Sequence, residues 1–313
     1  GGVKMDILDK LVSLAQISGS VDVQCLFQGG WYVRHEARRG QALVHIVTDG
    51  EGWLQVDGMD KPRLLGSGDV VFFPHKIGHV LSSDAACANT GAGVEIASNG
   101  VFTQKRSGSG KADLSLFCAR FDYDRQADLM DSLPETVFLN MRHTALQSVV
   151  AILQQEAERP QHGSKSVVDA LSTVLLVLLV RTFLSENRIP ALPDGILKGW
   201  HDRRLRGVIQ AVLAQPERAW NIEEMAAAAT VSRAQLMRLF KAQTGMSPYA
   251  FVNRIRLQQA AAMLKQGSDS VLAIALAVGF GSETHFGKAF KKAYGISPGQ
   301  YRKQAEDDME FVI

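Results

Sequence analysis

The sequence predicts an α+β protein of two domains. The N-terminal half is expected to form a β-barrel followed by a pair of helices, and the C-terminal half to be all helical. Three observations carry this prediction. Short runs with β-strand character, broken by glycine, fill residues 21–121. Apolar residues then recur at helical spacing, and one pattern near the C-terminus is present twice.

Length and composition agree with a soluble protein of this kind. The chain has 313 residues, 46% of them hydrophobic and 21% charged, as is typical of globular domains. Charges interrupt the first dozen residues, so they do not resemble a secretory signal. The most apolar stretch lacks charge only over residues 170–180, which is too short to cross a bilayer. We therefore expect a cytoplasmic protein without a membrane segment.

The N-terminal strands are predicted from runs such as WYVRHE, ALVHIV, GWLQVDG and GDVVFFP, several of which alternate apolar and polar residues. Turn signals such as Asp49-Gly50 separate them. The polar stretch at residues 98–111 is expected to be a loop. Many short strands at this spacing indicate a sandwich or barrel.

Two helices follow the strands. Residues 144–158 place apolar side chains on one face, whereas residues 166–186 are apolar nearly all round. A helix of the second kind is buried on more than one side, either inside the monomer or in a dimer interface. Pro190, Pro193 and Gly195 then mark a linker. The predicted domains are residues 5–187 and 199–313, joined by a linker at residues 188–198.

Charge is divided unevenly between the two parts. Residues 198–304 carry 16 Lys and Arg against 6 Asp and Glu, whereas the remainder carries 18 against 26. This asymmetry favours a polyanionic partner for the C-terminal domain. A solvated basic face is the alternative.

The C-terminal domain contains an internal repeat, at residues 222–248 and 271–298. Ser232, Phe240 and Gly245 recur 50 residues later, whereas residues before the serine recur after 49, so the second copy has one extra residue in its turn. Each copy predicts a helix, a turn and a second helix whose N-cap is the serine. A strong helix at residues 248–265 joins the copies and is expected to fix their spacing.

Each predicted second helix has an apolar stripe and a basic face. Leu236 with Phe240, and Phe286 with Phe290, are pairs at i, i+4 that face the core. A helix fits the major groove of B-DNA, where exposed side chains read base edges and cationic side chains and helix N-termini bind phosphate. Two copies on a linking helix therefore favour DNA binding over a helical bundle with a solvated surface.

Residues 205–303 resemble the AraC/XylS family of bacterial transcription regulators. The most specific motif covers residues 275–298, with VGF at 278–280, FKK at 290–292 and the final Ser-Pro. The resemblance implies that the two second helices enter successive major-groove segments. By position, base contacts would be made by Arg233, Ala234, Met237, Arg238, Glu283, Thr284, His285 and Lys288. Phosphate contacts are expected at Ser232, Lys241, Ser282, Lys291 and Lys292.

The stretch GDVVFFPHKIGH at residues 68–79 resembles the second motif of the cupin barrel. Catalytic cupins bind metal through an H-x-H pair, a glutamate and the histidine that corresponds to His79. This chain has no H-x-H, although His35, His45 and His75 could converge on His79 in the fold. A metal needs at least three well-placed ligands, and the spacing of these histidines does not indicate such a set. We therefore predict no metal, no cofactor, no catalytic residue and no enzymatic activity.

A cupin-like domain before an AraC-like domain resembles the sensor-regulators of this family, in which the barrel binds an effector and adjoining helices dimerise. The stretches MDILDKLVSLAQ, DVQCLF, VFFP, LSLFCARF, SLPETVFLN and SETHFGKAFK extend the resemblance over nearly the whole chain. In these stretches the chain is similar to multidrug-efflux activators of the Neisseria type, and more distantly to a subgroup that senses reactive chlorine. The implied partners are promoter DNA, RNA polymerase, an effector and a second copy of the chain.

Two kinds of effector remain open. Cys25 and Cys118 fall where the chlorine-sensing subgroup places its cysteines, and Arg120 on the same strand face could lower the pKa of Cys118. Alternatively, both cysteines simply pack in the core, and a small hydrophobic molecule binds in the barrel. The candidate effector or redox residues are Cys25, Cys118, Trp31, His35 and His79, with Tyr32, Phe72 and Phe73 as further aromatic neighbours.

Two rival functions are a metal-dependent cupin enzyme fused to a DNA-binding domain and a non-specific architectural DNA binder. The first requires stoichiometric metal. The second binds random and promoter duplexes alike.

Overall fold

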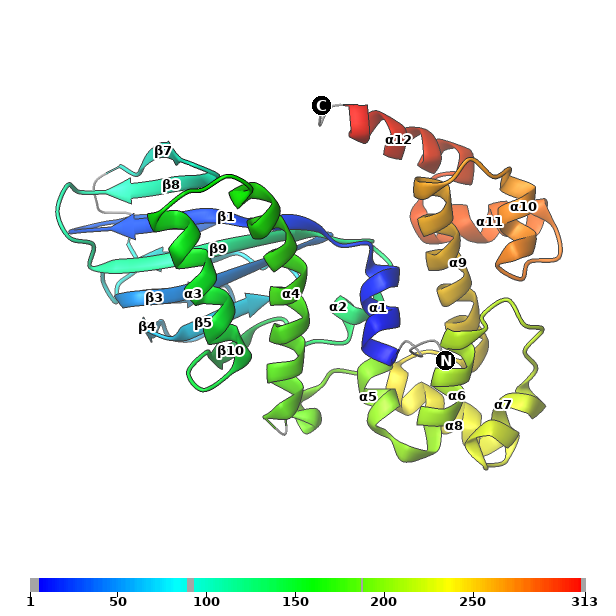
Figure 1. The fold of residues 1–313 in the computed structure, drawn as a ribbon. Coiled ribbons are helices and arrows are strands. Elements are labelled where there is room, and N and C mark those ends of the chain that lie inside the picture. Colours follow the sequence, from blue (N-terminus) through cyan, green and yellow to red (C-terminus); the bar gives the residue numbers. More distant parts are fainter. Residues whose placement is uncertain (1–5, 89–92, 187, 311–313) are drawn as a thin grey trace. The chain divides into compact units, whose positions relative to one another are not determined.

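The computed structural model describes residues 6–88, 93–186 and 188–310 and confirms the predicted α+β class (Figure 1). The chain divides into two compact units. One comprises residues 17–123 and 134–190, and the other residues 1–16, 124–133 and 191–313. Met5, Asn187 and residues 311–313, which lie at the ends of the predicted domains, fall outside the described residues.

The first unit is built on one curled sheet whose main path runs β10-β5-β3-β9-β1-β8-β7, with β6 and β4 also pairing with β3 and β2 pairing with β6. The pairing is antiparallel except for β1 with β8, which run parallel. The strands are β1 (Ser18–Phe27), β2 (Tyr32–His35), β3 (Gln41–Val56), β4 (Arg63–Gly66), β5 (Asp69–Phe73), β6 (His79–Ser82), β7 (Glu95–Asn99), β8 (Phe102–Ser107), β9 (Leu114–Asp122) and β10 (Val137–Asn140).

Strand β3 is long enough to pair with four other strands. Its first half pairs with β5 and β9, and its second half pairs with β4 and β6. The turn expected at Asp49-Gly50 is therefore wrong: the strand continues, with an irregular register against β9 between Val47 and Asp49. Gly50 has φ +75°, and a Cβ there would lie 1.9 Å from the carbonyl oxygen of Asp113. Glycine allows the strand to bend at this close approach.

The loop expected at residues 98–111 is also wrong. Its first two residues complete β7, and residues 102–107 form β8, which pairs with both β1 and β7. The strand has polar, partly exposed residues at Gln104, Lys105 and Arg106 because it lies near one edge of the sheet. A strand with little burial gives no apolar alternation to detect.

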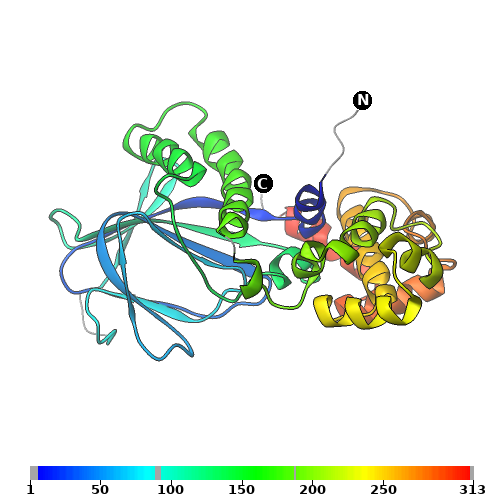
Figure 2. The same cartoon turned by 90° about the horizontal axis from the view of Figure 1, so that it is seen from below.

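Helices α3 (Ala145–Glu158) and α4 (Ser164–Ser185) lie together on one face of the sheet (Figures 1 and 2). Thr144 caps α3 by accepting a hydrogen bond from the backbone N–H of Leu146. The Ser172 hydroxyl of α4 accepts from the backbone N–H of Val21 in β1 at 3.2 Å. By length and composition α4 could cross a membrane, a test that core helices also pass, and its apolar residues pack here against α3 and β1.

The second unit is helical. It combines α1 (Ile7–Ala15) and the short α2 (Asp128–Asp131) with the C-terminal helices. These are α5 (Ile196–His201), α6 (Arg203–Ala214), α7 (Ile222–Ala229), α8 (Arg233–Thr244), α9 (Pro248–Gln266), α10 (Val271–Ala277), α11 (Glu283–Tyr294) and α12 (Pro298–Glu310). The sequence did not indicate that α1 or residues 124–133 would join this unit.

Candidate functional site

Two helix–turn–helix pairs, α7 with α8 and α10 with α11, occupy the positions of the sequence repeat. In the first turn the backbone N–H of Val231 donates to the carbonyl of Ala226, and in the second Phe280 donates to Ala275. These bonds are equivalent at an offset of 49 residues. Ser282, however, follows Phe280 after one additional residue, Gly281, so the insertion predicted from the sequence lies at the N-terminus of α11.

Both second helices begin at the serine caps that the repeat predicts, and both end at a glycine of the repeat. Ser232 and Ser282 accept hydrogen bonds from the backbone N–H groups of Gln235 and His285 at 3.2 and 3.1 Å. Gly245 and Gly295 end the helices in the left-handed conformation, with φ of +76° and +82°. The caps leave other N-terminal N–H groups unbonded within the helix, as an anion-binding helix end requires.

Apolar residues hold α8 and α11 against the linking helix α9. Leu236 and Phe240 are fully buried, and the Phe240 ring lies 5.5 Å from that of Phe251 near the start of α9. Phe286 and Phe290 are equally buried and pack in a cluster that includes the last turns of α9. The apolar face of each helix therefore packs against the linking helix, as predicted.

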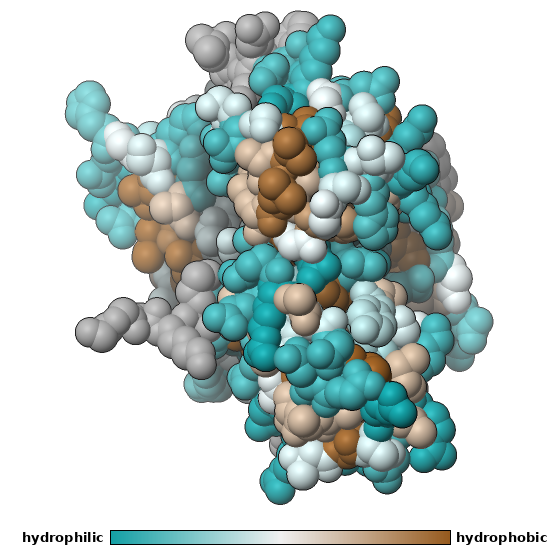
Figure 3. Space-filling view, turned by 90° about the vertical axis from the view of Figure 1, so that its right-hand side faces the viewer, coloured by the Kyte–Doolittle hydropathy of each residue, from teal (hydrophilic) through white to brown (hydrophobic). Residues whose placement is uncertain are grey.

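The opposite faces of α8 and α11 are exposed. Exposure is shared by all the residues expected from the sequence to contact bases or phosphate, namely Ser232, Arg233, Ala234, Met237, Arg238, Lys241, Ser282, Glu283, Thr284, His285, Lys288, Lys291 and Lys292. The molecular surface in Figure 3 is mainly hydrophilic, interrupted by separate hydrophobic patches. Among the residues of this unit that the structure describes, the exposed large apolar ones are Met237, Tyr249, Leu272 and Leu276.

Some of these polar groups already have partners. The Arg233 guanidinium pairs with the Glu223 carboxylate at 2.7 Å, and Lys241 Nζ donates to the carbonyl of Gly245 at 2.7 Å. Both ion-pair side chains are more than half exposed, so the pair is weak and can be exchanged for another anion. Lys241 lies over the C-terminus of its helix, where a cation is favourable.

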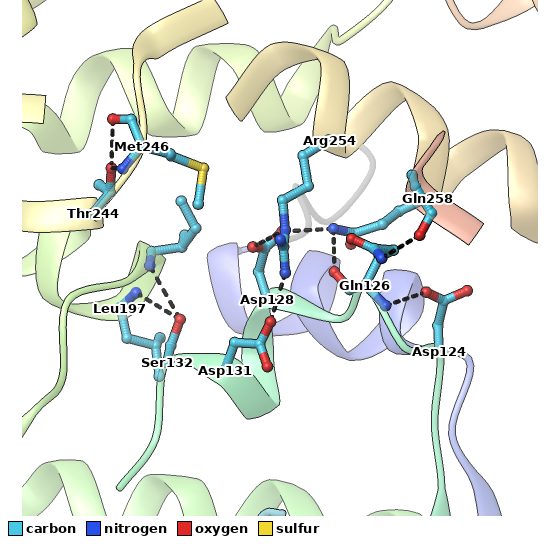
Figure 4. A network of polar contacts seen from close by, with 12 residues as sticks. Asp124, Gln126, Asp128, Asp131, Ser132, Leu197, Thr244, Met246, Arg254 and Gln258 are labelled. Carbon is cyan, nitrogen blue, oxygen red and sulfur yellow. Dashed lines mark hydrogen bonds and ion pairs between the residues drawn. The ribbon is translucent and has the colours of Figure 1, made fainter. Parts of the chain in front are cut away.

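A polar network around the buried residues Asp128 and Gln258 joins α2 to the linking helix and was not predicted from the sequence. Figure 4 shows Arg254 and Gln258 of α9 pointing toward Asp128 and Asp131. Arg254 pairs with Asp128 at 2.7 Å and with Asp131 at 2.6 Å. Gln258 Nε2 donates to the Asp128 carboxylate and to the carbonyl of Gln126, both at 2.6 Å. Burial raises the pKa of Asp128 to about 6, against the opposing effect of Arg254.

A second contact of this kind involves the C-terminus of α11. The Tyr294 and Tyr301 hydroxyls donate to the Asp124 carboxylate at 3.1 and 3.3 Å. Burial raises the pKa of Asp124 and of both tyrosines. Residues 124–131 therefore bind to α9 at Arg254 and Gln258, to the end of α11 at Tyr294, and to Tyr301 of α12. No local pattern in the sequence marks these long-range pairs.

In the sheet unit the two candidate cysteines lie side by side. Cys25 of β1 and Cys118 of β9 are buried, with their sulfurs 3.9 Å apart. The contact with Cys25 and burial raise the pKa of Cys118 well above its ordinary value. Arg120 does act to lower the pKa of Cys118, as expected, but the contact with Cys25 and burial outweigh it.

Three histidines also gather in the barrel interior. His35, His45 and His79 place one ring nitrogen each within 4.8 Å of the others. His75 is elsewhere, with Nδ1 3.2 Å from the Tyr123 hydroxyl. Two of the three histidines expected to converge on His79 therefore do so.

Of the four aromatic residues proposed near an effector, Tyr32 is half-buried and the other three are core residues. Trp31, Phe72 and Phe73 are at most 1% exposed. Trp31 stacks on Phe27 with ring centroids 4.7 Å apart, and Phe73 stacks on His79 at 4.2 Å. A hydrophobic ligand near these rings therefore requires them to repack.

Comparisons with known proteins agree with both halves of the molecule. Residues 6–185 match the family model described as cupin, and residues 225–304 match the one described as helix-turn-helix domain. The chain is 58% identical over 300 residues to the HTH-type transcriptional regulator MtrA of Neisseria gonorrhoeae, covering 96% of this chain and 99% of that protein.

More distant relatives also align over almost their full length. A putative AraC-like transcription regulator of Streptomyces lividans is 31% identical, covering 96% of this chain and 98% of the relative. The RCS-specific HTH-type transcriptional activator RclR of Escherichia coli is 29% identical with the same coverage. The resemblances expected from the sequence are confirmed, and the chain belongs to the AraC-type helix-turn-helix transcriptional regulators whose N-terminal half is a cupin domain.

Proposed function

We propose that this regulator recognises promoter sequence with the exposed faces of α8 and α11. The observation that carries the proposal is the repeated pair of helices, each anchored by buried phenylalanines and each presenting polar and cationic side chains. Since the linking helix α9 contacts both second helices, it fixes their spacing for two segments of one groove. The domain boundaries of 5–187, 188–198 and 199–313 belong to the same proposal.

Base recognition differs between the two helices. In α8, Arg238 is the main hydrogen-bonding reader, Ala234 and Met237 suit thymine methyl groups, and Arg233 must first leave Glu223. In α11, Thr284, His285 and Lys288 donate or accept at base edges, while Glu283 accepts from a cytosine amine. Phosphate contacts come from Ser232, Ser282, Lys241, Lys291 and Lys292.

Fluorescence anisotropy tests this proposal, with the protein's own upstream region against a scrambled duplex. Arg238→Ala and Lys288→Ala are each expected to weaken specific binding by about 1–3 kcal/mol and random binding less. Lys111→Ala, which removes an exposed charge on the other unit, is the control. Equal losses on both duplexes would refute base reading by these residues and favour an architectural binder.

For the signal, the cysteine pair favours an oxidant over the alternatives. A two-electron oxidant such as a hypohalous acid would remove two electrons and both thiol protons from Cys25 and Cys118 and leave a disulfide. The sulfurs need to approach from 3.9 Å to about 2.05 Å. The raised pKa of Cys118 makes this reaction slow unless the barrel opens.

The same titration repeated after mild oxidant tests this part. Oxidant is expected to change DNA affinity in wild type and in Cys87→Ser, but not in Cys25→Ser or Cys118→Ser. If wild type is unaffected, the cysteines are packing residues, and the effector to be sought is a small hydrophobic molecule.

We further propose a cytoplasmic homodimer that activates transcription by recruiting RNA polymerase and has no enzymatic activity. The family supports activation, and the apolar α4 supports a dimer. Sedimentation at increasing concentration tests the dimer, and a monomer at high micromolar concentration would refute it.

A further inference from the structure

The buried carboxylate of Asp124 lies where the chain returns to the helical unit after strand β9. The backbone N–H of Asp124 donates to the carbonyl of Ala15 at 2.8 Å, and the side-chain amide of Gln16 donates to the carboxylate at 3.4 Å. The end of α1 and the segment that begins at Asp124 are therefore bound to each other. Asp124 is thus held in place by a part of the chain that is far from the helix–turn–helix repeat in sequence.

The same carboxylate accepts hydrogen bonds from two tyrosines of the second repeat copy. Tyr294, the last residue of α11, donates at 3.1 Å, and Tyr301 of α12 donates at 3.3 Å. The Tyr294 ring also stacks on that of Phe290, with centroids 4.5 Å apart and an interplanar angle of 16°. Since Phe290 is fully buried, Asp124 is linked both to the end of α11 and, through one ring, to its apolar face.

Gln126 makes another bond to this end of α11. Its Nε2 donates to the carbonyl of Ala293 at 2.8 Å, which is one of the last four carbonyls that a helix cannot satisfy internally. The backbone N–H of Gln126 donates to the Asp124 carboxylate at 2.8 Å (Figure 4). Two side chains of one short segment therefore hold the C-terminal end of the second recognition helix.

The first repeat copy shows that the helix–turn–helix fold does not itself need these bonds. At an offset of 50 residues, Tyr294 corresponds to Thr244 and Tyr301 corresponds to Phe251. The Thr244 hydroxyl donates to a carbonyl of its own helix at 2.7 Å, and Phe251 has no hydroxyl. The second copy instead has two tyrosines at these positions, and both hydroxyls are directed to Asp124.

A buried carboxylate is not needed merely to stabilise such a junction. Replacing buried charged groups by well-packed apolar residues of similar volume is often neutral or stabilising. Hydrogen bonds, in contrast, lose strength steeply when their geometry changes. The donors Gln16, Tyr294 and Tyr301 therefore fix the place and direction of the Asp124 carboxylate, and with it the end of α11.

We propose that Asp124 and Gln126 are positioning residues for DNA reading by α11, so that a segment outside the repeat sets the base discrimination of the second helix–turn–helix pair. The inference rests on the proposed function, since it assumes that α11 reads bases. Base-edge hydrogen bonds weaken steeply when donor and acceptor lose their alignment. A shift at the C-terminal end of α11 therefore reaches His285 and Lys288 through a single helix of 12 residues.

Helix α8 is held at the equivalent carbonyl by a different segment. Gln243 corresponds to Ala293 in the repeat, and its carbonyl accepts from the backbone N–H of Gly195 at 3.1 Å. A backbone donor does not depend on the side chains at positions 124 and 126. Loss of the Asp124 contacts should therefore affect α11 and leave α8 in position, which separates a positioning role from a general loss of stability.

The test compares base discrimination at the two parts of the binding site. Fluorescence anisotropy with reduced full-length protein measures the affinity for the upstream duplex and for duplexes in which each base pair is exchanged singly. Arg238→Ala and Lys288→Ala assign base pairs to α8 and α11, because each variant loses discrimination at the pairs that its side chain reads. A wrong base pair ordinarily weakens specific binding by about 5- to 150-fold.

Tyr294→Phe, which keeps the stacked ring, and Asp124→Asn are each expected to lower discrimination at the α11 base pairs by at least about threefold, and at the α8 base pairs by less than about twofold. Combining the two changes should add little, because both remove the same hydrogen bond. Gln126→Ala should act in the same direction. Asp131→Asn, which alters a half-exposed carboxylate of the same segment, is the matched control and should leave both sets unchanged.

Equal losses at both sets of base pairs would overturn the proposal, and so would unchanged discrimination in folded Tyr294→Phe and Gln126→Ala variants. Circular dichroism establishes folding, and if Asp124→Asn fails to fold, the half-buried Tyr294 and Gln126 still decide the question. If Lys288→Ala loses discrimination at no base pair, base reading by α11 is itself refuted and the inference falls with it. The two failures are therefore distinguishable.

Discussion

The turn between α10 and α11 depends on a glycine that no other residue can replace without strain. Gly279 has φ +98°, and a Cβ there would lie 2.7 Å from the carbonyl oxygen of Glu217. That carbonyl cannot easily move away from a new Cβ, because the backbone on both sides of it is held by hydrogen bonds. Arg256 donates to the carbonyls of Pro216 and Arg218 on either side of it, at 2.7 and 2.8 Å. We predict that Gly279→Ala destabilises the helical unit.

The cost has two parts. A side chain in the left-handed region costs about 1–2 kcal/mol, and relieving the contact with a fixed backbone adds about 1–3 kcal/mol. Reduced entropy of the unfolded chain offsets about 0.4–1 kcal/mol. The net loss is about 1–4.6 kcal/mol, which lowers the Tm of a unit of this size by about 2–18 °C. Thr230, at the equivalent position of the first turn, carries a side chain at φ +56°. Because the first turn tolerates a side chain with positive φ, we expect the close contact to contribute the larger part of the stability loss in Gly279→Ala.

Gly281, two residues further on, is the matched control. A Cβ at Gly281 would meet nothing within 4 Å, so Gly281→Ala should change stability by no more than about 0.5 kcal/mol. Thermal unfolding of both variants, followed by circular dichroism, compares them directly. Similar Tm values for the two variants would refute the reasoning.

Three further predictions test the helical unit. Phe290→Ala should cost about 3–5 kcal/mol in urea unfolding, because the ring is fully buried; a smaller loss would mean that α11 repacks. Burial raises the pKa of Asp128 to about 6 in the folded state and also raises the pKa of Asp124, so stability should fall as pH rises from about 4 to 6. Asp128→Asn should reduce this slope, leaving the part that Asp124 contributes, while Asp131→Asn, at a half-exposed side chain, should keep it unchanged. Lys291→Ala should lower the salt dependence of DNA binding by about 0.9 in log–log slope on both specific and random duplexes, and an unchanged slope would exclude a phosphate contact.

The parts of the structure that the sequence predicted are those with strong local signals. The repeated serine caps and the apolar i, i+4 pairs each act within a few residues, so the helix–turn–helix pairs and even the inserted residue could be located. The exposure of the candidate DNA-contacting residues could also be predicted, because residues opposite a buried stripe are exposed.

What could not be predicted depends on long-range pairing. His35 joins the cluster only because β2 pairs with β6, and Asp128 meets Arg254 across more than a hundred residues of sequence. Strand β8 was mistaken for a loop because its polar residues are paired by backbone hydrogen bonds that carry no side-chain pattern. The periodicity of apolar residues indicates which face of a helix or strand is buried, but not which other element packs against that face.

The assignment of α1 and residues 124–133 to the helical unit means that the chain passes between the units at four places, after Gln16, Tyr123, Leu133 and Pro190. A recognition module excised at residue 199 would lack Asp124 and Asp128, and so would leave Tyr294 and Arg254 without carboxylates that they contact in the intact chain. Chimeras that exchange reading helices between relatives should therefore be cut at all four junctions. In a chimera joined only at the linker, residues 124–133 of one protein would have to pack against α9 and α11 of another. The solubility of such a chimera should be measured before its DNA specificity.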